Sequence, residues 1–271
     1  MQLRGTYKEI WQISYPVILG SIAHSVNQLI DTAFLGHSSK TALEAITIGG
    51  IFYFVFVFIA GGLARGSQVI IARYSGENKT HKIGIAFDHL LLISIVLSGF
   101  LMLFFHFGSP TVLNFVIKSK AIQIDALEYI QKMNYAVLPV VLGFAFNGFY
   151  TGIGKTKIIT IATLGMALTN IVLGYIFIFG KFGFEPMGIK GAGIATAVAD
   201  TVLFFIYTIH FFSFKLPEKY NAFTFKSIQF SQIISIIRLS TPIVLQNIIG
   251  IGSWWYFFLS VEKLGEQELG V

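Results

Sequence analysis

Residues 45–72 read AITIGGIFYFVFVFIAGGLARGSQVIIA, and Arg65 is the only charged residue among them. A helix needs roughly 20 mostly apolar residues to cross the hydrocarbon core of a bilayer, so this stretch is long enough to span a membrane. Apolar residues make up 55% of the 271-residue chain and charged residues only 12%. Soluble domains carry about a quarter charged residues. The sequence therefore predicts an all-α membrane protein whose helices are surrounded by the lipid bilayer.

Working outward from this stretch, seven spans are predicted, and each ends near glycine, proline or a charged cluster. They cover residues 11–35, 45–72, 83–107, 127–151, 158–179, 188–212 and 236–259. Residues 111–116 are apolar but too short to cross, so we expect them to lie at the interface. The longest connection, residues 213–235, carries Lys215, Lys219 and Lys226 among aromatic residues, which is typical of a linker lying on cytoplasmic headgroups.

The distribution of Lys and Arg between alternate loops predicts the orientation. Eleven such residues fall on the side of the N-terminus: Arg4, Lys8, Arg73, Lys79, Lys82, Lys155, Lys157, Lys215, Lys219, Lys226 and Arg238. Six fall on the opposite side: Lys40, Lys118, Lys120, Lys181, Lys190 and Lys263. Because cytoplasmic loops carry the excess of positive charge, we expect the N-terminus in the cytoplasm.

Several classes of function are disfavoured by composition. The chain has no cysteine, which excludes disulfides, thiolate metal sites and cysteine nucleophiles. Its net charge of +6 comes from short loops and forms no stripe that could follow phosphates, so no nucleic-acid partner is expected. Residues 148–156 end in Gly-Lys-Thr, but Phe149 replaces the glycine that a phosphate-binding loop requires. Neither an enzyme nor a bound cofactor is expected.

An internal repeat predicts the domain organisation. Residues 236–271 align without gaps onto residues 10–45, which places Pro242 on Pro16, Ser240 on Ser14 and Leu269 on Leu43. Six spans separate the two copies, so both cross in the same direction, as in parallel transporter repeats. We therefore predict a six-helix lobe over residues 1–212, a cytoplasmic linker over 213–235, and over 236–271 the first helix of a second lobe that is truncated.

Motifs along the whole chain resemble those of the MATE (multidrug and toxic compound extrusion) transporters. They are Tyr15-Pro16-Val17 leading to Asp31-Thr32-Ala33-Phe34-Leu35-Gly36, Gly76 after Ala72-Arg73-Tyr74, Gly152-Ile153-Gly154-Lys155-Thr156, Asn170-Ile171-Val172-Leu173 and Gly191-Ala192-Gly193-Ile194-Ala195-Thr196. The resemblance implies twelve helices in two six-helix lobes around a central cavity that opens alternately to either side. It also implies a multi-pass protein of the bacterial inner membrane.

A polar stripe on the first span marks a candidate site. His24, Asn27, Gln28 and Asp31 follow helical spacing, so they share one face of an otherwise apolar helix. Hydrogen bonding between helices would account for His24 and Gln28, although both are also candidates for a substrate cavity. A carboxylate at membrane depth is costly, and its default interpretation is a proton or cation site. The resemblance agrees, because the family's coupling acid in the first helix falls on Asp31.

Two further positions are assigned to the ion site by the resemblance. Asn170 and Thr196 match residues that, in one subgroup, help the first-helix acid to bind a cation or proton, although ordinary helix packing is an equal alternative. The second acid of that subgroup is replaced by Gly174, and an acid found in the seventh helix of another subgroup is replaced by Gly250. These departures weaken the case for sodium as the coupling ion. H⁺ and Na⁺ both remain candidates.

Three more residues are candidates for the substrate cavity. Asp200 follows Thr196 by one helical turn, where it can assist Asp31 or pair with a basic group such as Lys132. Asn147 is placed in the cavity as a polar residue within the fourth span. Trp254 can line a cavity for flat cations or belong to the aromatic belt at the membrane surface.

The sequence thus favours a secondary active antiporter. Asp31 would bind an inbound proton or sodium ion, and an amphipathic, often cationic, small molecule would be exported. A first alternative is a lipid-linked precursor or polysaccharide flippase of the same superfamily, which would need a cationic cavity for its pyrophosphate. A second alternative is a nonfunctional truncated product, or a half that acts by pairing with a second chain that replaces the missing C-terminal lobe.

Overall fold

The computed structural model describes residues 7–225 and 228–264, and within these ranges it contains helices and no strand. Arg4, Lys226 and Leu269 lie outside the described residues, as does the side chain of Lys263. The helices are α1 (Tyr7–Ser38), α2 (Lys40–Gly76), α3 (Thr80–Leu103), the π-helix η1 (Phe104–Gly108), α4 (Ser109–Val116), α5 (Lys120–Asn134), α6 (Val137–Gly152), α7 (Lys157–Phe179), α8 (Gly188–Ser213), α9 (Leu216–Tyr220) and α10 (Phe230–Leu264).

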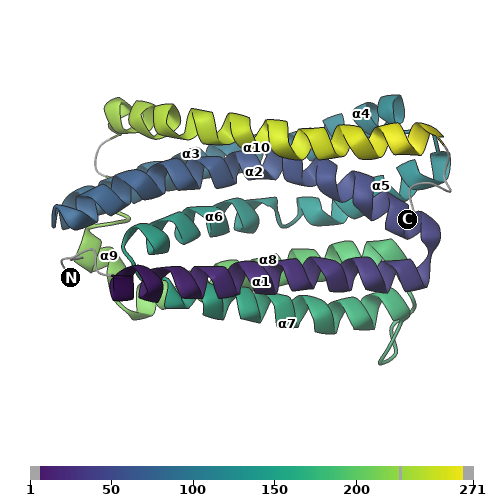
Figure 1. Cartoon of the computed structure of the whole chain (residues 1–271), viewed down its shortest axis with the longest axis horizontal. Coiled ribbons are helices and arrows are strands. Elements are labelled where there is room, and N and C mark those ends of the chain that lie inside the picture. The colour runs from purple at the N-terminus through teal and green to yellow at the C-terminus, as the bar shows by residue number, and fades with distance from the viewer. Residues whose placement is uncertain (1–6, 226–227, 265–271) are drawn as a thin grey trace.

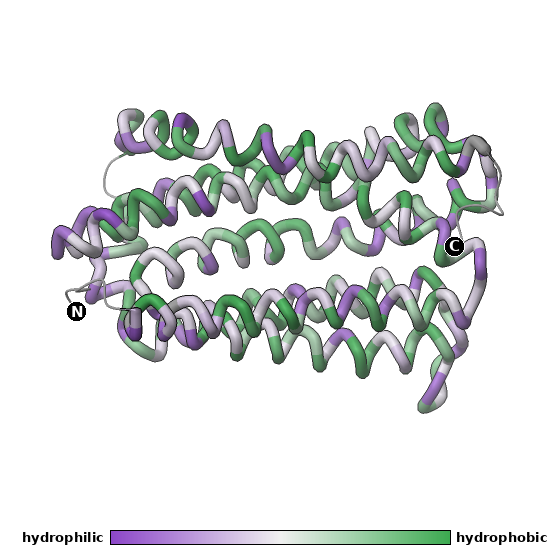
Figure 2. Tube along the Cα trace, in the orientation of Figure 1, coloured by the Kyte–Doolittle hydropathy of each residue, from purple (hydrophilic) through white to green (hydrophobic). Residues whose placement is uncertain are grey.

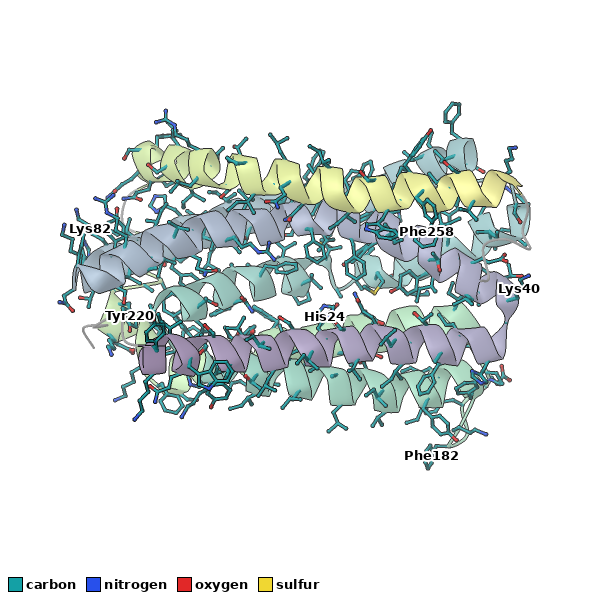
Figure 3. All side chains as sticks on the ribbon, viewed as in Figure 1. His24, Lys40, Lys82, Phe182, Tyr220 and Phe258 are labelled. Atoms are coloured by element: carbon teal, nitrogen blue, oxygen red, sulfur yellow. The ribbon has the colours of Figure 1, made fainter. Side chains whose placement is uncertain are left out.

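The long helices lie side by side in an elongated bundle (Figure 1). Helices α5 and α6 occupy its middle, with α2, α3 and α10 on one side and α1, α7 and α8 on the other. Hydrophilic residues gather at the two ends and in the connections (Figure 2). Lys82 lies at one end and Lys40 at the other (Figure 3), as the alternation of loops predicts. This arrangement is that of a multi-pass membrane bundle.

Five helical segments of the described chain are long and apolar enough to cross a membrane: Lys40–Gly76, Thr80–Val116, Lys157–Phe179, Gly188–Ser213 and Phe230–Glu262. The bent pair α5 and α6 makes a sixth if it counts as one span. Helix α1, the first of the seven predicted spans, is not in this group because its polar stripe lowers its hydropathy. With 32 residues it is nevertheless long enough to cross, at 1.5 Å per residue.

The segment predicted to lie at the interface instead continues the third span. Helices α3, η1 and α4 run on from Thr80 to Val116 without a break, because a π-turn at residues 104–108 carries the helix forward. Ser109 Oγ donates to the Phe105 carbonyl at 2.6 Å, and Leu113 is fully buried. Residues 111–116 therefore extend a spanning helix rather than forming a separate surface element.

The fourth predicted span, residues 127–151, is broken in the middle. Helix α5 begins earlier than predicted, at Lys120, and α6 starts after a bend of 60° at residues 135–136. Pro139 lies in the first turn of α6, where its missing N–H has no helical partner to lose. The bend brings α5 beside α8 and leaves α6 packed against α2 and α3.

Helix α10 packs along α2 through a seam of small residues. A Cβ atom built on Gly62 would lie 2.5 Å from Val244 Cγ2, and one on Gly66 would lie 2.8 Å from the Ser240 backbone nitrogen. The absence of side chains at both glycines therefore allows the two backbones to approach closely, as small residues do in membrane helix pairs. Ser240 Oγ also donates to the Leu63 carbonyl at 3.3 Å.

We predict that Gly66→Ala weakens this seam. The new methyl group would meet the backbone of α10, so the helices must separate, which costs about 1–3 kcal/mol. Thermal unfolding of the purified protein in detergent should show a lower midpoint. Gly250→Ala on α10 is the control, because a Cβ there meets nothing within 4 Å. Equal midpoints for the two variants would contradict the close approach.

The linker before α10 is bound to α3 by two buried side chains. Asp88 Oδ1 accepts the Phe223 N–H at 2.7 Å, and Asp88 Oδ2 accepts those of Thr224 at 3.0 Å and Phe225 at 3.3 Å. His89 Nε2 accepts the Gln229 N–H at 2.8 Å. Phe223 and Phe225 have φ values of 60° and 42°, a conformation that costs bulky residues about 1–2 kcal/mol each. The carboxylate holds the linker in that conformation.

This contact changes the prediction for residues 213–235. Part of the segment folds against α3 as α9 and the Asp88-bound loop, and residues 230–235 already belong to α10. At the opposite end of α10, Glu262 Oε1 accepts the N–H groups of Lys118 at 3.1 Å and Ser119 at 2.9 Å. The Glu262 carboxylate therefore holds one end of α10, and His89 holds the residue directly before the other end.

We predict that Asp88→Ala releases residues 223–225. Their amide hydrogens should exchange with solvent at least about tenfold faster, because a hydrogen bond to a charged group is worth about 1.5–3 kcal/mol. Hydrogen exchange followed by mass spectrometry of peptides from this loop measures the effect. Glu218→Ala, which removes an exposed acid from the same linker, should leave these rates unchanged. Protected amides in the Asp88 variant would show that other contacts hold the loop.

Candidate functional site

The polar stripe of α1 opens onto a cavity of about 290 Å³ inside the bundle. Helices α1, α2, α5, α7, α8 and α10 all contribute to its wall. His24 points from α1 toward the middle of the molecule (Figure 3). The polar or charged residues of the wall are His24, Asn27, Gln28, Asp31, Thr32, Thr47, Tyr129, Asn170, Thr196 and Asp200. All four residues of the predicted stripe thus line the cavity.

The packing of α1 against α7 aims the stripe at this cavity. Gly20 faces the side chain of Thr163, where an added Cβ would lie 3.4 Å from its hydroxyl oxygen. Thr160 Oγ1 donates to the Pro16 carbonyl at 2.7 Å, which joins the two helices one turn earlier. Because residues three and four apart share a helix face, fixing this contact fixes where the polar face beginning at His24 points.

Asp31 belongs to a hydrogen-bond network that joins three helices through Asn170. The carboxylate is buried, with 8% of the residue exposed, and its Oδ2 accepts a hydrogen bond from Asn170 Nδ2 at 3.3 Å. The same amide nitrogen donates to Thr196 Oγ1 at 3.0 Å. Thr196 in turn donates to the Ala192 carbonyl on its own helix. The structure therefore brings together Asp31, Asn170 and Thr196, which lie far apart in the sequence.

Two amide oxygens beside this network have no partner within the described chain. Asn27 Oδ1 and Asn170 Oδ1 are buried and accept no hydrogen bond there, although both residues line the cavity. A buried polar atom without a partner costs free energy, so each such atom in a folded protein calls for an explanation. With the Asp31 carboxylate, the two amide oxygens can coordinate a sodium ion or accept hydrogen bonds from a protonated group. The arrangement is thus suited to hold a small cation.

Asp200 lines the same cavity but is held differently. It is half-buried, and among the described residues no hydrogen bond or ion pair engages its carboxylate. The alternative pairing with Lys132 is therefore not formed. Asp31 and Asp200 are close enough to interact electrostatically. As far as the described residues form it, the cavity wall contains these two acids and no Lys or Arg side chain.

Two predicted cavity residues lie elsewhere. Asn147 is on α6, where its Nδ2 donates to the Tyr207 hydroxyl at 3.3 Å. Trp254 is 62% exposed, because α10 turns the next residue, Trp255, toward Phe52 of α2 with ring centroids 5.3 Å apart. Neither Asn147 nor Trp254 lines the cavity.

The apolar part of the wall was not predicted from the sequence. Tyr129 of α5, Phe54 of α2 and Phe258 of α10 each present an aromatic ring to the cavity. Aromatic residues are common in every span, so no local pattern singles these three out. Tyr129 lies on α5, which packs against α8, and its hydroxyl group interacts with Thr196.

The chain is similar in sequence to multidrug resistance proteins over most of its length. The multidrug resistance protein NorM of Photobacterium profundum is 23% identical over 260 residues, which cover 95% of this chain and 57% of that protein. The NorM protein of Vibrio cholerae is 25% identical, with coverage of 86% and 51%. The chain thus spans about half the length of the curated relatives it matches.

Solved structures of membrane transporters share the fold of this chain. The MATE multidrug transporter DinF-BH, solved in complex with a small molecule, superposes with a TM-score of 0.89 at 20% identity, covering 100% of this chain and 60% of that one. A MOP superfamily transporter from Pyrococcus furiosus superposes with a TM-score of 0.76 at 22% identity, with coverage of 89% and 52%. The sequence profile of the MatE family itself matches residues 16–176. The chain therefore belongs to the MatE family of membrane transporters.

Proposed function

We propose that this chain is part of a secondary active antiporter that exports amphipathic or cationic compounds in exchange for protons or sodium ions. The observation that carries the proposal is the buried Asp31 carboxylate, which lies in a cavity and is held by Asn170. An intramembrane acid that faces a cavity is most often part of an ion or substrate pathway. The names of the NorM relatives support the export of drugs.

The charge of the cavity supports a cationic substrate over a lipid-linked precursor. A pyrophosphate group needs Arg or Lys partners, and the described residues of this wall include neither. Two carboxylates and three aromatic rings instead suit an organic cation, which gains from both charge pairing and contact with ring faces. When a proton or sodium ion neutralises Asp31, attraction for the exported cation falls, and this difference couples the two fluxes.

We further propose that the N-terminus is cytoplasmic and that the bacterial inner membrane is the site of action. The excess of Lys and Arg at the end of the bundle that holds Lys82 supports this orientation. Because the chain spans about half the length of its relatives, transport is proposed to need a C-terminal lobe. That lobe would be supplied by further helices or by a second chain.

Replacing Asp31 by Asn tests the coupling role. The amide keeps the size of the side chain but can neither bind a proton nor carry a charge, so ethidium efflux should fall by about tenfold or more. Efflux is measured in cells that produce the chain, alone and joined to the C-terminal half of a NorM relative. Asp125→Asn removes an acid that does not line the cavity and should leave efflux unchanged. Undiminished efflux by the Asp31 variant would overturn the proposal.

Replacing Thr196 by Val tests whether the network binds the coupling ion. A ligand that binds only the folded state raises the unfolding temperature, so Na⁺ should stabilise the protein relative to choline if sodium is the ion. The Thr196 variant loses the hydroxyl that fixes Asn170, and the stabilisation should then shrink by half or more. Thr201→Val is the matched control, since its hydroxyl bonds only to Ala197 of its own helix. No effect of Na⁺ on the wild type would favour the proton.

A further inference from the structure

The two acids of the cavity differ in how the surrounding helices hold them. Asp31 is buried and tied through Asn170 to Thr196, so its carboxylate is part of a fixed network. Asp200 is more exposed, and no hydrogen bond or ion pair within the described ranges engages it. A side chain without fixed partners can turn toward a ligand without first breaking a bond. Within the described residues, the cavity thus contains one carboxylate that is held by a hydrogen bond and one that is not.

Asp200 lies on the same face of α8 as Thr196, next to the network that holds Asp31. It follows Thr196 by four residues on α8, so both face the cavity, with Asp200 one turn further along the helix. The position of Gly174 on α7 carries no acid, and its nearest polar neighbour is Asn170 Oδ1, 3.6 Å from a Cβ built there. The second negative charge of the cavity therefore comes from α8 rather than from α7.

Other features of the cavity also point to a bound cation. Asn27 is 5% exposed, and its Oδ1 atom is buried beside the cavity with no partner in the described chain. Phe54 and Phe258 belong to the apolar part of the wall, to which other apolar residues of α2, α7 and α8 contribute. An organic cation would satisfy both kinds of surface, because its charge pairs with a carboxylate while its rings or methyl groups contact the aromatic side chains.

We propose that Asp200 is the counter-charge for the exported organic cation, while Asp31 holds the coupling ion. The inference rests on the proposed function and divides its two binding tasks between two helices. Substrate and coupling ion then interact by electrostatic repulsion between neighbouring sites, rather than by exchange at one carboxylate. Asp200 accordingly determines the preference for positive charge in the substrate.

The test is equilibrium binding of phenyltrimethylammonium to the purified 271-residue protein in detergent, with empty micelles subtracted. The neutral isostere tert-butylbenzene, in which carbon replaces the charged nitrogen, measures the contribution of shape alone. The wild type should prefer the cation. Asp200→Asn should weaken binding of the cation roughly tenfold and leave that of the isostere unchanged, because only a charge interaction is removed.

Three further variants complete the experiment. Asp200→Glu keeps the charge and should retain the preference for the cation, which separates loss of charge from loss of folding. Asp31→Asn should lower the preference less than Asp200→Asn does, and Asp125→Asn, outside the cavity, should keep all of it. Only samples that elute as a single species from gel filtration are compared.

The possible results separate this inference from the proposed function. A wild type that binds neither compound overturns both. A wild type that prefers the cation, together with an Asp200→Asn variant of unchanged preference, overturns the role of Asp200 and leaves the export proposal standing. Loss of preference in Asp31→Asn but not in Asp200→Asn would show that a single acid serves both tasks, and would equally overturn the inference.

Discussion

Asp31 lies on a helix that exposes apolar residues such as Ile22 and Leu29 on its other faces. A carboxylate turned toward hydrocarbon costs several kcal/mol, so α1 has one acceptable rotation, the one that faces Asp31 into the bundle. The contacts of Gly20 and Pro16 with α7 fix that rotation. The cavity follows from it, because the wall must supply polar partners to a stripe that lipid cannot solvate.

The polar partners in the network of Asp31 come from α7 and α8, which are packed against each other. Asn170 is 1% exposed, and its amide nitrogen serves both Asp31 and Thr196, so α1, α7 and α8 are joined at a single point. Its oxygen is left without a partner among the described residues. A network that is satisfied on one side only costs stability, and such a cost is commonly found where a protein binds something.

How far the sequence predicts the fold depends on which forces act locally. Helices α7 and α8 match the predicted residues 158–179 and 188–212 almost residue for residue, because glycines and charges bound their apolar runs. The early start of α5 was missed because its first turns are polar, and the continuation through η1 because a π-turn has no sequence signal. Both elements are stabilised by contacts that sequence spacing does not encode.

In the site too, some residues could be predicted from local sequence and others depend on packing between helices. Helical spacing alone places His24, Asn27, Gln28 and Asp31 on one face, and the resemblance to MATE transporters adds Asn170 and Thr196. That Asp200 faces the cavity without Lys132 depends on how α5 and α8 pack. Trp254 and Asn147 do not line this cavity, because the packing of neighbouring helices decides which side of an apolar span faces it. That Tyr129 lines the cavity depends on the same packing of α5 against α8.

The glycine seam between α2 and α10 has a kinetic consequence. At Gly62 and Gly66 no side chain of α2 stands between the two backbones, so a displacement of α10 along α2 there meets no rotamer barrier. The hydrogen bonds that Asp88 and His89 accept from the residues before α10, and those that Glu262 accepts near the other end of the helix, must also break before the helix can slide. Movement of α10 along α2 therefore requires these hydrogen bonds to break together with the two that α10 donates to α2 within the bundle, from Ser240 to the Leu63 carbonyl and from Asn247 to the Phe58 carbonyl.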